Sequence, residues 1–230
     1  MNSAGRESAA AAKERRVGLA VNLAGLYAIL DLRDDSAPGL ESLATRLLEG
    51  GCRVMQLRAK NVSASLMLAH ARTLQNLCRQ ANALFVVNDR LDIALAAGAG
   101  GIHLGQNDLP PEEARRLAPP DFVIGLSTHS AQEVAAAATR PVDYIGYGPI
   151  FPTRSKSDAA KPRGLSGLRE AAGLSHLPIV AIGGIETDRA AEVFTAGASA
   201  VAMVGALERS ASPRALTEAL RKLAGDTAEK

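Results

Sequence analysis

The sequence predicts an α/β protein built as a single (β/α)8 barrel, the TIM-barrel fold, with an extra helix before the first strand. Short apolar segments alternate with longer amphipathic ones from Leu26 to the C-terminal end, and the alternation repeats eight times. Alternating strands and helices favour a parallel sheet, and eight strands are the number that closes a barrel. A length of 230 residues suits such a barrel as one domain.

The expected elements follow one another along the whole chain. Strands are predicted at residues 26–30, 53–57, 84–88, 101–104, 122–126, 144–147, 179–182 and 200–204. Helices are predicted at residues 40–49, 64–81, 90–97, 111–117, 131–138, 166–174, 188–196 and 213–223. An Ala-rich, charged segment predicts an N-terminal extension over residues 1–22, frayed or helical, so that the barrel domain spans 23–230.

Turn residues support this order of elements. Glycine follows three of the expected helices, at Gly50, Gly98 and Gly197, and glycine accepts the left-handed conformation that often ends a helix. Ser130 and Glu133 have the spacing of a capping box, which starts a helix at residue 131. A doubly wound open sheet is the competing architecture, but it needs a glycine-rich turn after its first strand, where this chain has the sequence DLRDD (31–35).

Composition excludes several classes of function. The net charge is only +2, aromatic residues make up 3% of the chain and tryptophan is absent, so we expect neither a nucleic-acid nor an anionic-membrane surface. Cys52 and Cys78 are too far apart for a zinc or redox pair, and we expect both to be reduced and buried. No apolar segment has transmembrane length and no signal peptide is evident, so a cytoplasmic location is expected. The oligomeric state stays open, with a homo-oligomer as one option.

Charged residues gather where the second strand is expected to end, which is the end where barrel enzymes build their active sites. Gln56, Arg58 and Lys60 occupy every second position, so we expect them on one face of the strand. An arginine and a lysine side by side repel each other and suit a phosphate, which arginine binds through two parallel hydrogen bonds. The alternative is two solvated charges, or a pair satisfied by a neighbouring acid.

Two aspartates follow the third and fourth strands, which are neighbours in a barrel. Asp89 and Asp108 are therefore expected to meet across the mouth, where carboxylates and a substrate phosphate suit Mg2+. Taken singly, each aspartate is better explained as a helix cap or a turn residue. Together, beside a cationic strand end, they favour a metal site.

Glycines and a long polar loop follow the last three strands. The glycines after strands seven and eight, at Gly183, Gly184 and Gly205, lie where barrel enzymes often bind phosphate through backbone N–H groups. A tight turn is the alternative, although it explains one loop more readily than both. The loop over residues 150–164 has the length and polarity of a lid or a ligand clamp.

Histidine offers little covalent chemistry. His129 beside Ser127 is a candidate acid-base pair, whereas His103 lies within a strand and is expected to be a hydrogen-bonded core residue. No third residue orients the pair and no nucleophile-elbow sequence surrounds the serine, so a catalytic triad is not expected.

As a set, these motifs resemble the thiamine-phosphate synthase family. The resemblance covers residues 26–207, in order and at matching spacing, and is specific as a set rather than in any one piece. The matching segments are QLRAK (56–60), Asn88-Asp89, HLGQND (103–108), GLSTH (125–129), DYIGYGPIFPT (143–153), Lys156 and AIGGI (181–185).

The resemblance implies a transferase that joins 4-amino-2-methyl-5-pyrimidinylmethyl diphosphate to 4-methyl-5-(2-phosphoethyl)-thiazole, or to its carboxylated precursor, and releases diphosphate. It implies small phosphorylated molecules as partners and Mg2+ as cofactor, bound by Asp89 and Asp108. The residues implied to bind the pyrimidine diphosphate are Gln56, Arg58, Lys60, Asn88, Ser127 and Lys156, of which Arg58, Ser127 and Lys156 are expected to act on the reacting groups. Those implied to face the thiazole phosphate are Thr153, Ser155, Gly184, Val204 and Gly205.

The chain departs from the family pattern at two of these positions. Ser155 stands where the family usually has threonine and keeps the hydroxyl, whereas Gly205 stands where serine is common and can offer only its N–H. The related thiazole tautomerase, on the same barrel, is the nearest alternative function, and a non-enzymatic phosphate-binding barrel is a third. The two aspartates with Arg58, Lys60 and Lys156 favour the synthase, because the tautomerase reaction releases no diphosphate.

Overall fold

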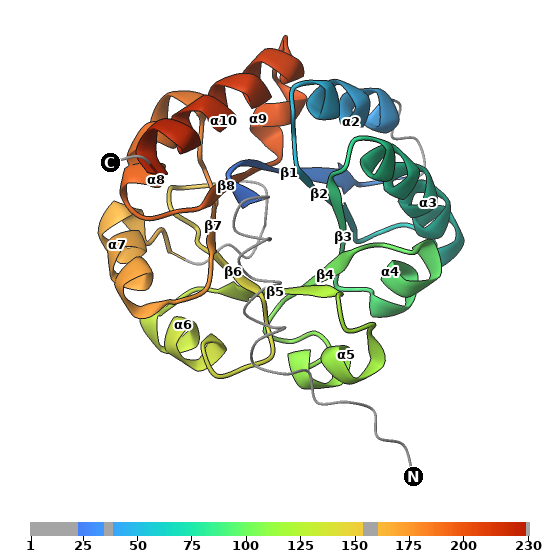
Figure 1. Cartoon of the computed structure of the whole chain (residues 1–230), viewed down its shortest axis with the longest axis horizontal. Coiled ribbons are helices and arrows are strands. Elements are labelled where there is room, and N and C mark those ends of the chain that lie inside the picture. Colours follow the sequence, from blue (N-terminus) through green and yellow to red (C-terminus); the bar gives the residue numbers. More distant parts are fainter. Residues whose placement is uncertain (1–22, 35–38, 154–160, 229–230) are drawn as a thin grey trace.

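Eight strands form one closed parallel barrel, arranged around the ring in sequence order (Figure 1). The computed structural model describes residues 23–34, 39–153 and 161–228. Strand β1 pairs in parallel with both β2 and β8, which closes the ring. The strands are β1 (Gly25–Leu32), β2 (Val54–Ala59), β3 (Leu84–Asn88), β4 (Gly101–Leu104), β5 (Val123–Thr128), β6 (Tyr144–Tyr147), β7 (Ile179–Ile182) and β8 (Ala200–Met203). The predicted (β/α)8 barrel is confirmed.

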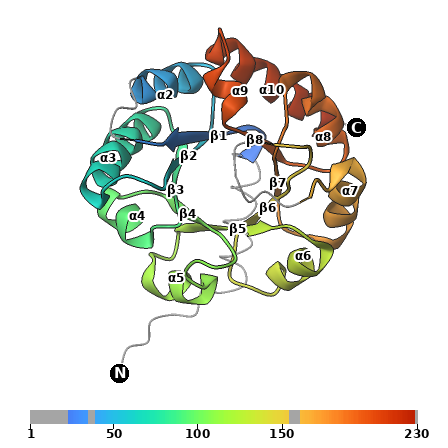
Figure 2. The ribbon, with the colours of Figure 1, turned by 180° about the vertical axis from the view of Figure 1, so that it is seen from behind.

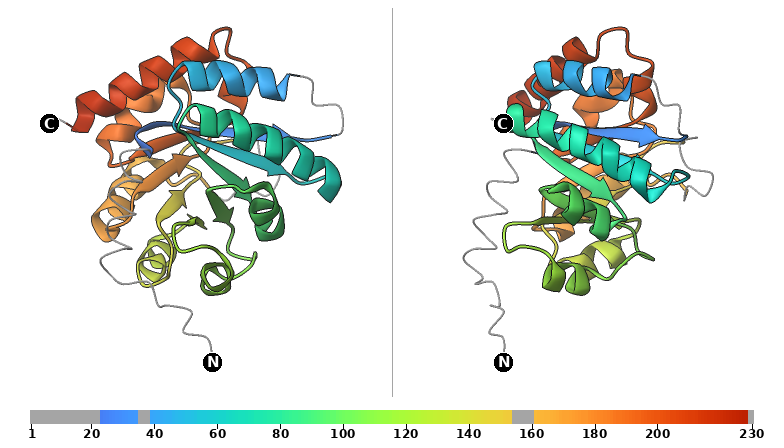
Figure 3. Two further views of the ribbon diagram at one scale, coloured as in Figure 1. Left: turned by 45° about the vertical axis from the view of Figure 1, so that its right-hand side comes forward. Right: turned by 90° about the vertical axis from the view of Figure 1, so that its right-hand side faces the viewer.

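Helices surround the barrel as an outer ring, seen from its two ends in Figures 1 and 2 and from the side in Figure 3. They are α2 (Leu40–Glu49), α3 (Ala64–Gln80), α4 (Leu91–Ala97), α5 (Pro111–Leu117), α6 (Ala131–Ala137), α7 (Gly164–Leu174), α8 (Ala190–Thr195), α9 (Gly205–Glu208) and α10 (Pro213–Ala228), with the 3-10 turn η1 (Thr187–Arg189) before α8. Among the described residues, no helix has both the length and the apolar character needed to cross a membrane.

Most element bounds lie within two residues of the prediction. The predicted helix at 188–196 begins instead as the turn η1, and α10 continues to Ala228. Helix α9 was not predicted, because four residues are too few for a hydrophobic period to show. The N-terminal extension over 1–22, with its extra helix, lies outside the described residues.

The interior of the barrel has an apolar half and a polar half. Side chains alternate between the two faces of each strand, so every second residue points inward. Two residues beyond the inward Ile29, Val54 and Val86, the next inward positions are Asp31, Gln56 and Asn88. The polar half therefore lies at the carboxyl ends of the strands. The apolar half is filled by a buried cluster of Leu23, Tyr27, Ile29, Val54, Val86, Val123, Tyr144, Val180, Ala200 and Ala202.

A second and larger apolar cluster lies between the barrel and the helices. It includes Cys52 and Cys78, which are both buried and free, as the sequence predicted. Burial raises the pKa of the Cys52 thiol to about 11 and that of the Cys78 thiol to about 12. Neither thiol is therefore a nucleophile at neutral pH.

A buried ion pair joins α5 to the amino ends of β5 and β6. Asp143 is fully buried, and its Oδ2 accepts hydrogen bonds from Arg115 Nη2 at 2.6 Å and from the Ile124 backbone N–H at 2.8 Å. Arg115 Nη1 also donates to the Phe122 carbonyl at 2.6 Å. One arginine thus ties a helix to two strands, at the end of the barrel opposite the polar half.

We expect Arg115→Met to lower the free energy of unfolding by about 3–5 kcal/mol, because the change removes the guanidinium that pairs with the buried Asp143 carboxylate. Arg116→Met is the matched control: its pair with Glu113 is exposed, and its loss should change stability by less than about 0.5 kcal/mol. Urea unfolding of the two variants measures both values. Equal losses would show that the buried pair contributes no more than a surface pair.

Candidate active site at the carboxyl ends of the strands

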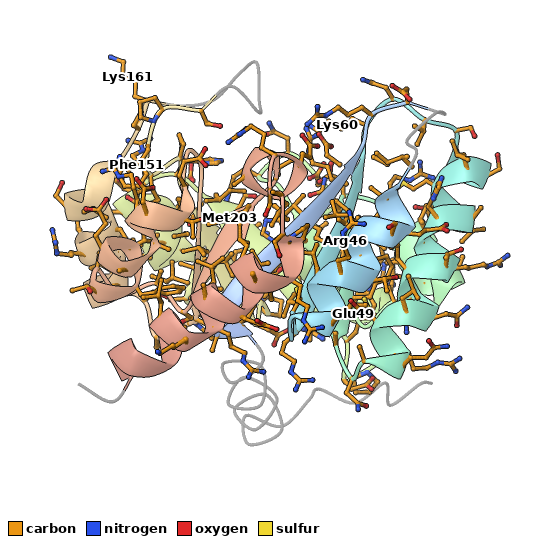
Figure 4. The ribbon with its side chains drawn as sticks, turned by 90° about the horizontal axis from the view of Figure 1, so that it is seen from above. Arg46, Glu49, Lys60, Phe151, Lys161 and Met203 are labelled. Atoms are coloured by element: carbon orange, nitrogen blue, oxygen red, sulfur yellow. The ribbon has the colours of Figure 1, made fainter. Side chains whose placement is uncertain are left out.

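The polar half of the barrel opens at the carboxyl ends of the strands. Lys60 and Lys161 both lie at this rim, at the upper edge of Figure 4. Lys60 follows the last residue of β2 and is exposed, whereas Gln56 on the same strand is only 3% exposed. Along the inward face of β2, exposure therefore increases from the buried Gln56 amide, through the partly buried Arg58, to the exposed Lys60 ammonium at the rim.

Arg58 is held by an acid that the sequence analysis did not single out. Asp31 Oδ1 accepts a hydrogen bond from Arg58 Nη1 at 2.5 Å, and Asp31 Oδ2 accepts one from Arg33 Nε at 3.0 Å. The Asp31 side chain is 7% exposed, so its charge lies nearly buried between two guanidinium groups. The alternative of a cation satisfied by a neighbouring acid is thus realised for Arg58. A guanidinium carries five N–H donors in a fixed plane. By bonding to Arg58 Nη1, Asp31 therefore also orients the other N–H donors of Arg58, which can bind an anion.

Three predicted binding residues belong to one hydrogen-bonded network of six side chains from six strands, which we call the mouth network. Its first half links β3, β2, β1 and β6. Gln56 Nε2 donates to Asn88 Oδ1 at 2.8 Å, and the Tyr27 hydroxyl donates to Gln56 Oε1 at 2.7 Å. The hydroxyls of Tyr27 and Tyr144 lie 2.8 Å apart. Burial raises the pKa of both tyrosines well above the ordinary value, so both are neutral phenols.

The second half of the mouth network reaches β4 and β5. His103 Nδ1 lies 3.0 Å from the Tyr144 hydroxyl, and His103 Nε2 lies 2.9 Å from Ser127 Oγ. Two inward-facing glycines leave the space that the rings need. A Cβ on Gly125 would overlap the Tyr144 ring, and a Cβ on Gly146 would lie 3.1 Å from His103 Cε1. The glycines of the GLSTH and DYIGYG segments therefore serve the packing of this network.

The predicted pairing of His129 with Ser127 is wrong. His129 Nδ1 lies 2.8 Å from the Gly148 carbonyl, and its backbone N–H donates to the Glu133 carboxylate at 2.6 Å. Ser127 is bonded instead to His103, which confirms that His103 is a hydrogen-bonded residue of the barrel interior. The error arose because β5 ends at Thr128, so His129 no longer follows the alternation of the strand.

Asp89 and Asp108 lie past the ends of the neighbouring strands β3 and β4, and both are half-buried. The Asp89 N–H donates to the His103 carbonyl at 2.9 Å, and Asp89 has a left-handed backbone with φ of 62°. The N-caps of α4 and α5 are Arg90 and Pro110, so neither aspartate occupies a cap position. Asp108 closes the turn after β4, because its Oδ2 accepts a hydrogen bond from the Gly105 N–H at 2.7 Å.

The donor set at this edge of the mouth fits a magnesium ion. Within the described ranges, no group of three or more His, Cys, Asp and Glu side chains could hold a metal ion. Magnesium retains water molecules and is commonly bound by one or two carboxylates together with substrate phosphates. The two half-buried carboxylates of Asp89 and Asp108 match this donor chemistry, whereas a structural zinc site would need a closed set of nitrogen or sulfur ligands.

The glycines after β7 pack against the loop that follows β6. The Phe151 N–H donates to the Gly183 carbonyl at 2.9 Å, and a Cβ on Gly184 would overlap the Pro152 carbonyl. These glycines thus allow the loop after β7 to pack closely against the loop after β6. This packing brings the start of the loop with Thr153 onto the end of β7. Ser155, Lys156 and the other residues of 154–160 lie outside the described residues.

Ion pairs hold the short helix α9 at the end of β8. Val204 is its N-cap and Gly205 its first residue. Glu208 accepts a hydrogen bond from Arg33 at 2.9 Å, and Arg209 donates to Glu186 at 2.6 Å. The turn after β8 is therefore braced from the end of β1 on one side and from the loop after β7 on the other.

Sequence reasoning missed three residues of the site, Asp31, Tyr27 and Tyr144, and it placed His103 in the interior without assigning it to the site. The signal for Asp31 was present, because the alternation that grouped Gln56, Arg58 and Lys60 also makes Asp31 an inward residue near the end of β1. The two tyrosines gave no such signal. A buried aromatic residue near the start of a strand is expected to belong to the apolar core. The contacts of Tyr144 with Tyr27 and with His103 join strands that are not neighbours in the barrel.

The chain is similar to known proteins in both sequence and fold. The family model described as Thiamine monophosphate synthase matches residues 26–207, the same range as the resemblance in the motifs. Proteins named thiamine-phosphate synthase are 44% identical in Chlorobium phaeovibrioides, over 82% of this chain and 90% of the relative, and 45% identical in Laribacter hongkongensis, over 83% and 90%. The solved structure of thiamine phosphate pyrophosphorylase from Pyrococcus furiosus has a TM-score of 0.81 and 38% identity, and the match covers 91% of this chain and 98% of that one. The chain belongs to the thiamine monophosphate synthase family.

Proposed function

We propose that this protein is a transferase that carries out the thiamine-phosphate synthase reaction. It transfers the 4-amino-2-methyl-5-pyrimidinylmethyl group from its diphosphate to the ring nitrogen of 4-methyl-5-(2-phosphoethyl)-thiazole, or of the carboxylated form, and releases diphosphate. The observation that carries the proposal is the family match from β1 to α9, with the charged residues of the matching motifs at one barrel mouth.

The two substrates use different parts of the mouth. Gln56, Arg58, Lys60 and Asn88 bind the pyrimidine diphosphate together with Lys156, and Ser127 contacts the same substrate. This assignment is supported by the Gln56–Asn88 hydrogen bond, which joins β2 to β3 one inward position before Arg58 on β2. The thiazole phosphate is faced by residues after β6, β7 and β8, namely Thr153, Ser155, Gly184, Val204 and Gly205.

Asp89 and Asp108 are the residues that would hold Mg2+. Their place past two neighbouring strands and their partial burial support this role, as does the donor chemistry described above. When bound, Mg2+ neutralises charge on the diphosphate and stabilises it as a leaving group.

The residues of the protein act by position and charge. As diphosphate departs, negative charge grows on its oxygens, and the N–H donors of Arg58 and the Lys60 ammonium stabilise this charge more in the transition state than before it. The aminopyrimidine ring delocalises the positive charge left on its methylene carbon. The thiazole nitrogen attacks that carbon from a position fixed by the thiazole phosphate, so no catalytic triad is needed.

A diphosphate-release assay tests the proposal. With Mg2+ and both substrates, we expect diphosphate and thiamine phosphate in equal amounts, and no diphosphate when either substrate is omitted. Conversion of the carboxylated thiazole to its aromatic isomer without the pyrimidine substrate would instead identify a tautomerase. Tight binding of the thiazole phosphate without any turnover would identify a non-enzymatic binding protein.

Gly205→Ser should lower KM for the thiazole phosphate by about three- to tenfold, because it adds a hydroxyl donor for a charged group at the first residue of α9. A Cβ at this position meets only the flexible end of Arg209, 2.8 Å away, so the fold should tolerate it. Gly173→Ser, in open space on α7, is the matched control and should leave both KM values unchanged. A higher KM in Gly205→Ser would mean that the phosphate occupies the space above Gly205.

A further inference from the structure

The mouth network has one direction of hydrogen-bond donation, which can be followed from β3 inward. Gln56 gives its Nε2–H to Asn88 and leaves Oε1 as the acceptor for Tyr27. A phenol carries a single proton, and Tyr27 gives its proton to Gln56. In the 2.8 Å contact between the two hydroxyls, Tyr144 must therefore be the donor.

The same reasoning fixes the protonation of His103. Tyr144 has given its proton to Tyr27, so in the 3.0 Å contact its oxygen must accept from His103 Nδ1–H. A neutral imidazole carries one N–H, which leaves Nε2 as an acceptor. The hydroxyl of Ser127, 2.9 Å from Nε2, must then donate to the ring.

We infer that Tyr27, Tyr144 and His103 are positioning residues that hold His103 as the Nδ1–H tautomer and make Ser127 a hydrogen-bond acceptor toward its ligand. With its proton directed at His103, Ser127 offers only lone pairs to the mouth. It selects a ligand that places an N–H there, and rejects one that places a carbonyl or another bare acceptor.

The inference rests on the proposed function for the identity of that ligand. In the proposed reaction, the exocyclic amino group of the pyrimidine is an N–H donor of the required kind. The direction of the network is a property of the protein without ligand. It can therefore be tested separately from the reaction.

Burial makes the direction hard to reverse. Tyr27 and Tyr144 are 2% and 0% exposed, so their hydroxyls are shielded from bulk solvent and bond to other side chains of the network. Reversal requires the amides of Gln56 and Asn88 to rotate together, since each amide offers an oxygen on one side and N–H groups on the other. The Tyr144 ring packs directly against Gly125, in the space that a side chain at that position would occupy.

Nitrogen NMR of the imidazole ring in the ligand-free protein at neutral pH measures the tautomer directly. We expect the His103 signals of a ring protonated at Nδ1 and bare at Nε2. A ring protonated at Nε2, or at both nitrogens, would overturn the inference. The reading requires no substrate and no activity.

Tyr27→Phe should reverse the tautomer of His103, although Tyr27 bonds to Tyr144 and not to the histidine. Without the Tyr27 oxygen, the buried Tyr144 hydroxyl can donate only to His103 Nδ1, because a buried donor without an acceptor is costly. The imidazole proton then moves to Nε2 and is donated to Ser127, whose own hydroxyl turns to the mouth. We expect KM for the pyrimidine diphosphate to rise about tenfold with little change in kcat.

Two further variants keep the test decisive. Tyr147→Phe removes a hydroxyl from the same strand as Tyr144 but in the cluster outside the barrel, and should leave the tautomer and KM unchanged. Ser127→Ala should also leave Nδ1 protonated, because the direction is set from the Gln56 end. A reversed tautomer in Ser127→Ala, or an unchanged one in a folded Tyr27→Phe, would refute the network. If the tautomers behave as expected while the protein forms no thiamine phosphate, the proposed function fails and the positioning role stands.

Discussion

Asp89→Asn and Asp108→Asn should each lower synthase turnover by at least about a hundredfold, equivalent to about 3 kcal/mol of transition-state stabilisation. Chelation of divalent cations should abolish turnover, and added Mg2+ should restore it in the unaltered protein. The reason is electrostatic, because two carboxylates at the ends of neighbouring strands repel each other and a diphosphate unless a cation lies between them. Asparagine keeps the shape of the side chain and removes its charge. Diphosphate release over a range of Mg2+ concentrations measures the effect.

Thermal stability separates a metal site from a structural role for these aspartates. Asparagine tolerates the left-handed backbone of Asp89, and its amide oxygen can still accept the Gly105 N–H at position 108, so unfolding temperatures should change little. Asp121→Asn, an exposed change at the amino end of β5, is the matched control and should leave turnover unchanged. Variants that unfold at lower temperature but keep Mg2+-dependent turnover would show that the carboxylates are structural and that the metal binds elsewhere.

Arg58→Ala and Lys60→Ala should lower kcat/KM for the pyrimidine diphosphate by about one to two powers of ten, a loss of roughly 1.5–3 kcal/mol, while KM for the thiazole phosphate stays nearly constant. Arg58 should show the larger loss, since its side chain is 17% exposed and oriented by Asp31, whereas Lys60 is exposed. Steady-state kinetics with each substrate varied in turn separate the two effects.

Arg53→Ala provides the matched control, because Arg53 directly precedes the first residue of β2. Its guanidinium donates to the Ala81 carbonyl at the amino end of β2, away from the mouth, so its loss should not change either KM. Near-normal kinetics in both mouth variants would refute the assignment of the diphosphate to Arg58 and Lys60. An equal loss for both substrates would mean that the two phosphates share these cations.

The fold was predictable because its signals are local. Apolar alternation and glycine at helix ends mark the strands and helices, and the count of eight closes the barrel. The same alternation placed Gln56 and Arg58 on one inward face. It could not show that Arg58 meets Asp31, since a sequence gives the face of a residue but not its partner across a strand pair.

The mouth network marks the limit of that reasoning. His103 is bonded not only to Ser127 on the adjoining strand β5 but also to Tyr144 on β6, two strands away around the barrel. Contacts across the interior depend on the stagger of the strands and on the space left at Gly125 and Gly146. Proximity in sequence misled in the opposite direction, because it paired His129 with Ser127.

The apolar half of the interior also closes the barrel to molecules at its amino end. Its side chains are nearly or fully buried, so the barrel is plugged at the amino end and open at the other. Every molecule that enters or leaves the barrel must therefore pass through the mouth at the carboxyl ends of the strands. In the proposed reaction, both substrates must therefore enter, and both products must leave, through the mouth that holds Gln56 and Asn88.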